Sequence, residues 1–420
     1  MKKNLILQLI PIVGLLFGSF LESKAQETQS FKEIKGIVID LNTKDPLMLT
    51  DLAVKGSNIS TVTNADGEFI LKIPNTQLND YLVVSRLGYL EQELSIADLT
   101  DNMTIALSPA ITQLAEIKIA SFKDAKSLFE AMMKNRNKLF SNESAVLTAF
   151  YRETIKKRRR NASLTEAVIQ IHKRPNNALR RDGIELIRAR KNTDYSRLDT
   201  IALKLQGGPF SNLYTDIVRY PDYVFSHDDI PFYDFSFGKA TQINDTPVYV
   251  VNFKQKPEVV MPLYYGKLYI DANSLALIKA DYRLNVENKE LTSRMFVRKK
   301  PTRVDVYPTE ARYIVNYRKK DGLWQMAYTN IQLTFKVDWK GKLFNSVYTL
   351  DSEMAITDWQ LDENASVKNN QNIIRPSTVL VDKASGFSDP RFWGEYNIIE
   401  PEESIETAIR KIQRQLERSS

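Results

Sequence analysis

The two histidines of this chain lie in sequence contexts that do not form a zinc-peptidase site. A zinc carboxypeptidase needs a His-x-x-Glu pair and a later His as metal ligands, together with a Glu that acts as general base. Here His172 precedes Lys-Arg-Pro and His227 precedes Asp-Asp-Ile. The sequence therefore predicts no metallocarboxypeptidase activity.

Other catalytic motifs are missing as well. The chain has no cysteine, no G-x-S-x-G nucleophile elbow and no phosphate-binding G-x-x-x-x-G-K loop. His227 with Asp228, Asp229 and Asp234 can be interpreted as a metal site, but a solvated acidic loop is the favoured interpretation. We predict no catalytic residue, no metal and no cofactor. A hydrolase that uses two facing carboxylates stays a third hypothesis, because such a pair has no sequence signature.

One segment, residues 220–237, is dense in aromatic side chains. Such a segment can stack sugar rings or line an apolar ligand groove. The alternative, which we favour, is a strand and loop packed into a hydrophobic core. The candidate groove residues are Tyr220, Tyr223, Phe225, Phe232, Tyr233, Phe235 and Phe237.

The first 25 residues have the features of an export signal. Lys2 and Lys3 precede an apolar run, and Ser23 and Ala25 are the small residues that a signal peptidase recognises. We expect cleavage after Ala25, with an uncleaved membrane anchor as the alternative. Without cysteine the chain cannot be a lipoprotein. The expected location is the periplasm or the periplasmic face of the outer membrane, so the basic runs at 156–160 and 298–300 do not indicate nucleic-acid binding.

Residues 26–120 show short alternating runs separated by turn signals, which is the pattern of a β-sandwich. Asp66-Gly67 predicts a tight turn before a strand in which Phe69, Leu71 and Ile73 face a core. The ordered motifs G-x-V-x-D, KG before T-x-x-D-G-x-F, and S-x-x-GY resemble the carboxypeptidase regulatory-like domain, a transthyretin-like sandwich. That resemblance implies an accessory domain without catalysis of its own.

The rest of the chain is predicted to be mainly β with minor α. A linking helix is expected over 121–142, capped at Ser121 and Asp124, followed by a large antiparallel meander or half-barrel over 143–398 and an amphipathic helix over 399–420. Arg152-Glu153 can be a buried ion pair or two outward side chains. The hairpin YYGKLYIDANSLALIKADYRL resembles one found in periplasmic lipoprotein carriers. That resemblance implies a sheet that wraps a helix, here 122–140.

The motifs FYRE, GGP and FWGEYNIIEPEESIETAI resemble exported proteins of Gram-negative bacteria that join this regulatory-like domain to a C-terminal β-domain. No particular activity follows from that resemblance. The sequence predicts a non-enzymatic binding or scaffold protein of the cell envelope, with outer-membrane proteins, glycan or lipid as partners. The alternative is a carrier of lipid or lipoprotein with an apolar groove.

Overall fold

A computed structural model describes residues 30–110, 122–158, 160–176, 178–193, 206–243, 246–341, 345–362, 372–386, 392–402 and 405. The predicted signal segment 1–25 and most of the predicted C-terminal helix lie outside these residues. Among the described helices, none is long and apolar enough to cross a membrane. The described part is mostly β, which confirms the predicted fold class.

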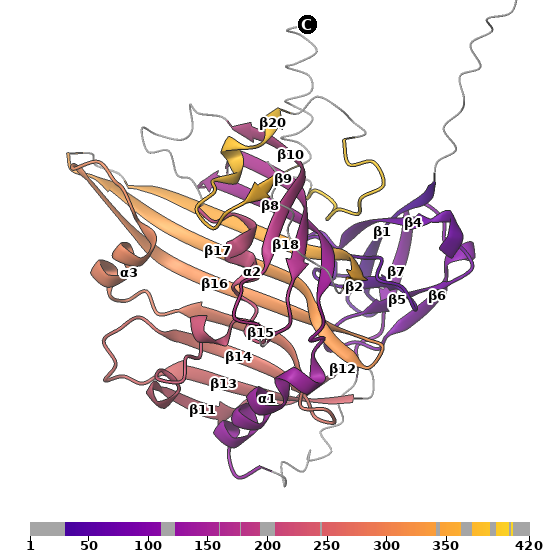
Figure 1. The fold of residues 1–420 in the computed structure, drawn as a ribbon, viewed down its shortest axis with the longest axis horizontal. Coiled ribbons are helices and arrows are strands. Elements are labelled where there is room, and N and C mark those ends of the chain that lie inside the picture. The colour runs from indigo at the N-terminus through magenta and orange to yellow at the C-terminus, as the bar shows by residue number, and fades with distance from the viewer. Residues whose placement is uncertain are drawn as a thin grey trace, which may run out of the picture.

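The N-terminal region is a β-sandwich of two sheets (Figure 1). In the first sheet β1 pairs antiparallel with β4 and parallel with β7, and the second sheet has the order β3-β2-β5-β6. The strands are β1 (Phe31–Asp40), β2 (Asp51–Val54), β3 (Ser60–Val62), β4 (Glu68–Pro74), β5 (Tyr81–Ser85), β6 (Gln92–Ser95) and β7 (Met103–Leu107). The predicted turn is present: Gly67 has φ +75°, and the Asn64 side chain accepts hydrogen bonds from the amides of Asp66 and Glu68.

A single sheet of 13 strands, antiparallel except where β20 pairs parallel with β10, forms most of the remaining described chain, in the order β11-β13-β14-β15-β16-β17-β18-β8-β9-β10-β19 with β12 and β20 at the sides. The outer members β11 and β19 do not pair with each other within the described residues, so the sheet stays open. Its long strands are β8 (Ala145–Lys157), β9 (Arg160–Lys173), β10 (Gly183–Thr193), β13 (Thr246–Gln255), β14 (Tyr264–Asp271), β15 (Leu277–Leu284), β16 (Val304–Lys320), β17 (Leu323–Trp339) and β18 (Ser346–Leu361). The short ones are β11 (Tyr233–Phe237), β12 (Thr241–Ile243), β19 (Ile373–Ile374) and β20 (Ser385–Gly386).

The predicted meander is present, with one difference in connectivity. The hairpin turns at Asp321-Gly322 and Lys340-Gly341 join β16, β17 and β18 as expected. The last long strand, β18, then pairs with β8, the first strand of this region. Two successive meanders are thereby joined side by side into one sheet, which Figure 1 shows strongly twisted.

Three short helices accompany the sheet: α1 (Ala125–Leu139), α2 (Pro209–Leu213) and α3 (Lys289–Phe296). Helix α1 is the predicted linking helix, and its side chains Leu128 and Phe129 are fully buried in the main hydrophobic core. Its N-cap is Asp124, whose carboxylate accepts from the Ser127 amide, while Ser121 lies outside the described residues. Helix α2 donates the Asn212 amide to the carbonyls of Thr329 and Ser352. Both helices therefore cover the same face of the sheet, which we call the groove face.

The sandwich packs on the opposite face, and the segment Phe392–Glu400, which we call the strap, lies between the two. Trp393 contacts Phe150 of β8 with ring centroids 5.5 Å apart. Asn397 exchanges two hydrogen bonds with the backbone of Lys72 in β4, at 2.6 and 3.0 Å. Ile70 and Lys72 are consequently only 6% and 7% exposed. The sequence predicted a strand buried on one side, and the strap buries the other side as well.

Replacing Gly67 by Val tests the turn that orders the sandwich. A side chain at this φ is strained, and an added Cβ would lie 2.7 Å from the Val38 carbonyl oxygen and 2.9 Å from Pro46 Cβ. We expect a loss of about 2–4 kcal/mol in the free energy of unfolding, measured by urea denaturation of the mature chain. Gly56→Val is the matched control, because Gly56 has φ +71° and open space around it. An equal loss in the two variants would contradict the steric argument.

Candidate functional site

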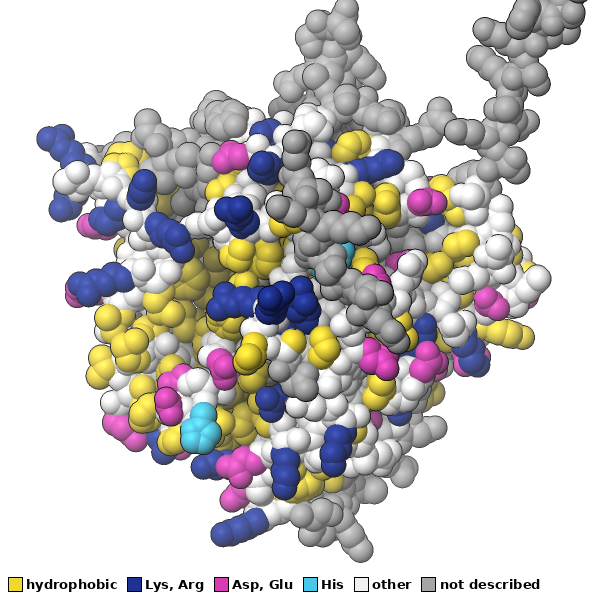
Figure 2. Space-filling model, viewed as in Figure 1, with side chains coloured by type: hydrophobic (Ala, Val, Ile, Leu, Met, Phe, Trp, Pro, Cys, Tyr) yellow, Lys and Arg dark blue, Asp and Glu magenta, His cyan; other side chains and the backbone are white. Residues whose placement is uncertain are grey.

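An apolar groove of about 460 Å³ opens on the groove face, between α2 and α3. Figure 2 shows hydrophobic side chains gathered over this side of the molecule, with Lys and Arg side chains around them. The apolar part of the lining consists of Phe210, Phe296, Val306, Ile331, Leu333, Phe335 and Leu350. This volume falls within the range of roughly 300–1,000 Å³ typical of small-molecule sites.

The strands build the floor of the groove by simple alternation. Residues directly opposite each other on neighbouring strands point to the same face of a sheet. One such row contains Tyr313, Ile331 and Ser352, and the next contains Leu333 and Leu350. These side chains belong to the long, regular strands β16, β17 and β18, so a rigid sheet supports the floor.

Two segments outside the strands form the walls of the groove. One wall is α3 with the residues after it, including the exposed Met295, Arg298 and Lys299. The other wall contains Gly207 and Gly208, whose φ values are +99° and +49°. A Cβ at Gly207 would lie 2.8 Å from Ser211 Oγ, so glycine is required there for the chain to enter α2. The GGP motif of the sequence thus shapes one wall of the groove.

A buried carboxylic acid lies beside the floor. Glu153 is 2% exposed, and the Tyr151 hydroxyl donates to its carboxylate at 3.0 Å. Burial raises the pKa of Glu153 to about 7, and the hydrogen bond from Tyr151 opposes this shift only in part. Ser352 and Tyr151, which both line the groove, lie next to Glu153 in the sheet. The polar end of the floor can therefore change charge near neutral pH.

The aromatic segment 220–237, a candidate ligand groove for which the sequence favours core packing, lies away from the groove. Phe225 and Tyr233 are 2% and 3% exposed, and Phe225 contacts Phe129 of α1 at 4.7 Å. Tyr220, Phe235 and Phe237 pack against the same core, while Tyr223 and Phe232 are largely exposed. None of the seven lines the groove. The geometry is that of the alternative interpretation, a strand and loop packed against the core.

The helix 122–140 does not enclose an open space either. Leu268 and Ile270 of β14 are fully buried in the core that α1 covers. The groove lies farther along the sheet, where α3 replaces α1. The alternation of Leu333, Phe335 and Leu350 was visible in the sequence, but the same pattern is typical of filled cores.

The polar groups singled out in the sequence are dispersed. The side chains of His227 and Asp228 are fully exposed, and His172 lies in β9 with Glu185 at 3.5 Å. Within the described ranges no three His, Asp or Glu side chains come together as a metal site would require. Burial raises the pKa of Asp351 to about 7, as it does for Glu153. Asp351 pairs with Thr154, however, so it leaves the sheet on the face opposite to Glu153, and the two carboxyls do not face each other.

The raised pKa of Glu153 has a consequence for stability. Its folded pKa of about 7 exceeds the usual 4.5 of a free carboxyl, so the fold favours the protonated form. The contribution of protonated Glu153 to the free energy of unfolding is fully present below pH 4.5 and is lost as the pH rises through about 7. We compare the free energy of unfolding of Glu153→Gln with that of the parent chain. As the pH is raised from 5 to 8, we expect this difference to change by about 2–3 kcal/mol in favour of the variant. Urea denaturation at both pH values measures this. The exposed Glu130→Gln is the control, and an equal pH response in both variants would contradict the assignment.

Three comparisons with known proteins bear on this architecture. Residues 34–119 match the sequence model of the CarboxypepD_reg-like domain. The chain is also 33% identical over 115 residues to the TonB-dependent receptor SusC of Bacteroides thetaiotaomicron. That alignment covers 27% of this chain and only 11% of the length of SusC.

Two solved structures align with this chain at low identity. A DUF1329 family protein from Desulfovibrio piger aligns with 58% of this chain and 96% of its own, at 11% identity and a TM-score of 0.23. A putative membrane-associated protein of unknown function from Bacteroides fragilis aligns with 78% of this chain and 98% of its own, at 8% identity and a TM-score of 0.16. The sandwich motifs and the family match agree: residues 34–119 form a CarboxypepD_reg-like domain.

Proposed function

We propose that this chain is a non-enzymatic binding protein of the bacterial cell envelope that holds the acyl chain of an anionic amphiphile in the groove. The observation that carries the proposal is the open apolar groove between α2 and α3 on the groove face. A groove lined by Leu, Ile, Val and Phe offers an acyl chain the same transfer out of water that a core offers a side chain.

The residues at the edge of the groove favour a ligand with a negative head group. Arg298 and Lys299 line the groove and are exposed, so they can contact a carboxylate or phosphate while the chain lies below. Neighbouring Lys300, in contrast, is held by the Val304 carbonyl and by Asp305. The arrangement is an apolar floor with cations at its margin.

The envelope location rests on two observations. The first is the export signal predicted over residues 1–25. The second is the similarity of the sandwich region to part of SusC, a TonB-dependent receptor. We propose that the sandwich is a docking module for an outer-membrane partner, while the large sheet carries the ligand.

Titration of the mature protein with a dansyl-labelled undecanoic acid tests the groove. We expect saturable binding with an increase in fluorescence as the probe leaves water. Leu333→Trp fills the floor and should weaken binding at least tenfold, about 1.4 kcal/mol. Leu361→Trp adds the same bulk at a side chain that is 61% exposed and outside the groove, and it should bind like the parent chain.

A second pair of variants does not alter the core. Arg298→Gln removes a cation of the margin and should weaken binding about two- to fivefold, the usual range for an exposed ion pair. Arg294→Gln removes a cation on α3 that already pairs with Glu290 and does not line the groove, so it should have no effect. Probe binding that is absent, or that survives Leu333→Trp in a folded protein, would refute the proposal.

A further inference from the structure

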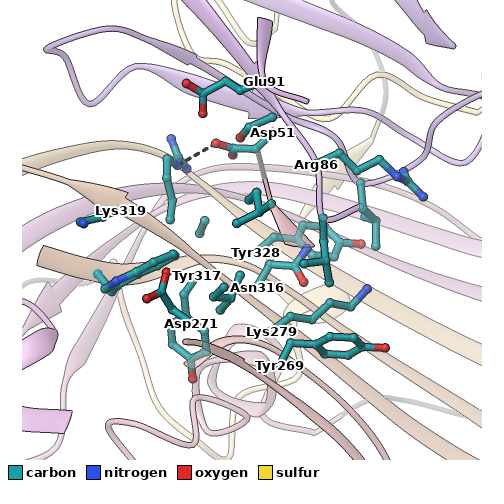
Figure 3. Close-up of a pocket in the computed structure, with 18 of the residues that line it drawn as sticks. Asp51, Arg86, Glu91, Tyr269, Asp271, Lys279, Asn316, Tyr317, Lys319 and Tyr328 are labelled. Carbon is teal, nitrogen blue, oxygen red and sulfur yellow. Dashed lines mark ion pairs between the residues drawn. The ribbon is translucent and has the colours of Figure 1, made fainter. Parts of the chain in front are cut away.

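The sandwich and the large sheet enclose a second, larger hollow on the face opposite to the groove. This interdomain cleft has a volume of about 1290 Å³. Figure 3 shows Asp51 and Arg86 of the sandwich on one side of this cleft and Tyr269, Lys279, Asn316 and Tyr328 of the sheet on the other. Strand β16 lines both spaces, one from each face of the sheet. Its Tyr313 lines the groove, and its Ile314 and Asn316 line the cleft.

The cleft exists because the two surfaces around it meet at their margins and not at their centre. At one margin the Gly88 amide donates to the Gln242 carbonyl at 2.8 Å. At the other, Asp51 pairs with Arg318 at 3.0 Å and Ser60 donates to the Ile356 carbonyl at 3.1 Å. Between these contacts the sandwich presents the small side chains Ala53, Val83 and Ser85. The space between them is therefore not filled by the protein.

The sheet side of the cleft carries four polar or aromatic residues in register. Tyr269 of β14 lies opposite Lys279 of β15, which lies opposite Asn316 of β16, which lies opposite Tyr328 of β17. The Lys279 ammonium lies 5.8 Å from the centre of the Tyr269 ring. Arg86, directly after β5, lines the cleft from the sandwich side (Figure 3).

Positive charge exceeds negative charge in the cleft, with nine Lys and Arg side chains against five Asp and Glu. Several of these charges are paired, as Lys55 is with Glu93 at 2.7 Å. Within the described part of the chain, Arg86 and Lys279 form no ion pair. Burial lowers the pKa of Lys279; Asp281 opposes this shift, and the charge of Arg86 adds to it. Burial also lowers the pKa of Arg86. The fold thus holds two cations near each other at a cost that an anion between them would relieve.

Residues with unpaired hydrogen-bonding atoms also line this cleft. Two buried donors, Arg86 Nη1 and Trp324 Nε1, and two buried acceptors, Asn316 Oδ1 and Gln325 Oε1, have no partner among the described residues. All four residues line the cleft. Buried polar atoms without partners are rare and mark places where a ligand or water completes the structure. A ligand that satisfies this set must offer both donors and acceptors.

We propose that the interdomain cleft binds an acidic saccharide, with its anionic group between Arg86 and Lys279. The carboxylate supplies the missing negative charge, and the hydroxyls serve as donors to Asn316 and Gln325 and as acceptors from Trp324. The face of a sugar ring can pack on Tyr269. The size of the cleft fits a short oligosaccharide better than a single sugar. This binding is independent of the acyl groove on the other face of the sheet.

Isothermal titration calorimetry of the mature chain with trigalacturonate tests the proposal. We expect saturable binding that weakens as salt is added, and at least tenfold weaker binding of the fully methyl-esterified trisaccharide, which has the same shape without charge. Triglutamate and inorganic phosphate should also bind at least tenfold more weakly, because they lack the sugar hydroxyls. Equal affinity for any of these three probes, or no saturable binding of trigalacturonate, would overturn the proposal.

Variants locate the site. Arg86→Gln and Lys279→Gln should each weaken trigalacturonate binding at least tenfold and should not lower the melting temperature of the free protein, because each removes a cation whose pKa burial lowers and that forms no ion pair within the described residues. Lys35→Gln removes the same charge from an exposed position of the sandwich outside the cleft and should bind like the parent chain. Unchanged binding in either cleft variant would overturn the assignment, and if one variant fails to fold, the other decides. Leu333→Trp should leave trigalacturonate binding unchanged, so failure of one proposal is distinguishable from failure of the other.

Discussion

Arg152 is the residue on which the assembly of the two domains depends. Its guanidinium is 2% exposed and lies 2.8 Å from Glu166 and 3.0 Å from Glu353. It also donates to the Ile399 carbonyl of the strap at 2.8 Å. Burial would raise the pKa of Glu166, but Arg152 and Arg190 outweigh burial and hold that pKa below its usual value. The strap is therefore attached to the sheet by a buried charge network in which every member has a partner.

The consequences of this network reach the sandwich through the strap. Trp393 packs on Arg190 at 4.7 Å and on Phe150, and Asn397 then binds the backbone of Lys72 in β4. Removing one partner of a buried ion pair leaves an uncompensated charge and typically costs 3–5 kcal/mol. In this protein such a loss would also free the strap, and with it the surface on which Val62 and Ile70 of the sandwich are buried. Domain docking and the interdomain cleft thus have a common electrostatic origin.

Local features of the fold were predictable from the sequence, whereas the long-range ones were not. Asp66-Gly67 and Asp321-Gly322 specify turns through backbone dihedrals that glycine adopts freely, and the strands beside them follow by alternation. The partners of Arg152 are 14 and 201 residues away along the chain, and no local pattern indicates them. Neither of the two interpretations of Arg152-Glu153 holds: both side chains are buried, yet they do not pair, because adjacent residues of a strand point to opposite faces and each finds its partners on its own face. The groove was missed for a related reason: only α3, placed by the fold, distinguishes its floor from a filled core.

The contrast between the two faces of the sheet explains where binding capacity was retained. On the face toward the sandwich, the Arg152 network satisfies its buried charges completely, while in the interdomain cleft Asn316 and Gln325 of the sheet and Arg86 of the sandwich keep unpaired polar atoms. On the other face, side chains fill the space under α1 but not the space beside α3. A protein selected only for stability would pair the polar atoms of the cleft and fill the groove beside α3, because unpaired buried polar atoms and empty apolar space both cost free energy. Both the cleft and the groove lie against the long strands β16 and β17, where a site keeps its shape without a ligand. Stability is supplied by the network and the core, and within the described residues the groove and the interdomain cleft are spaces that the fold leaves available to ligands.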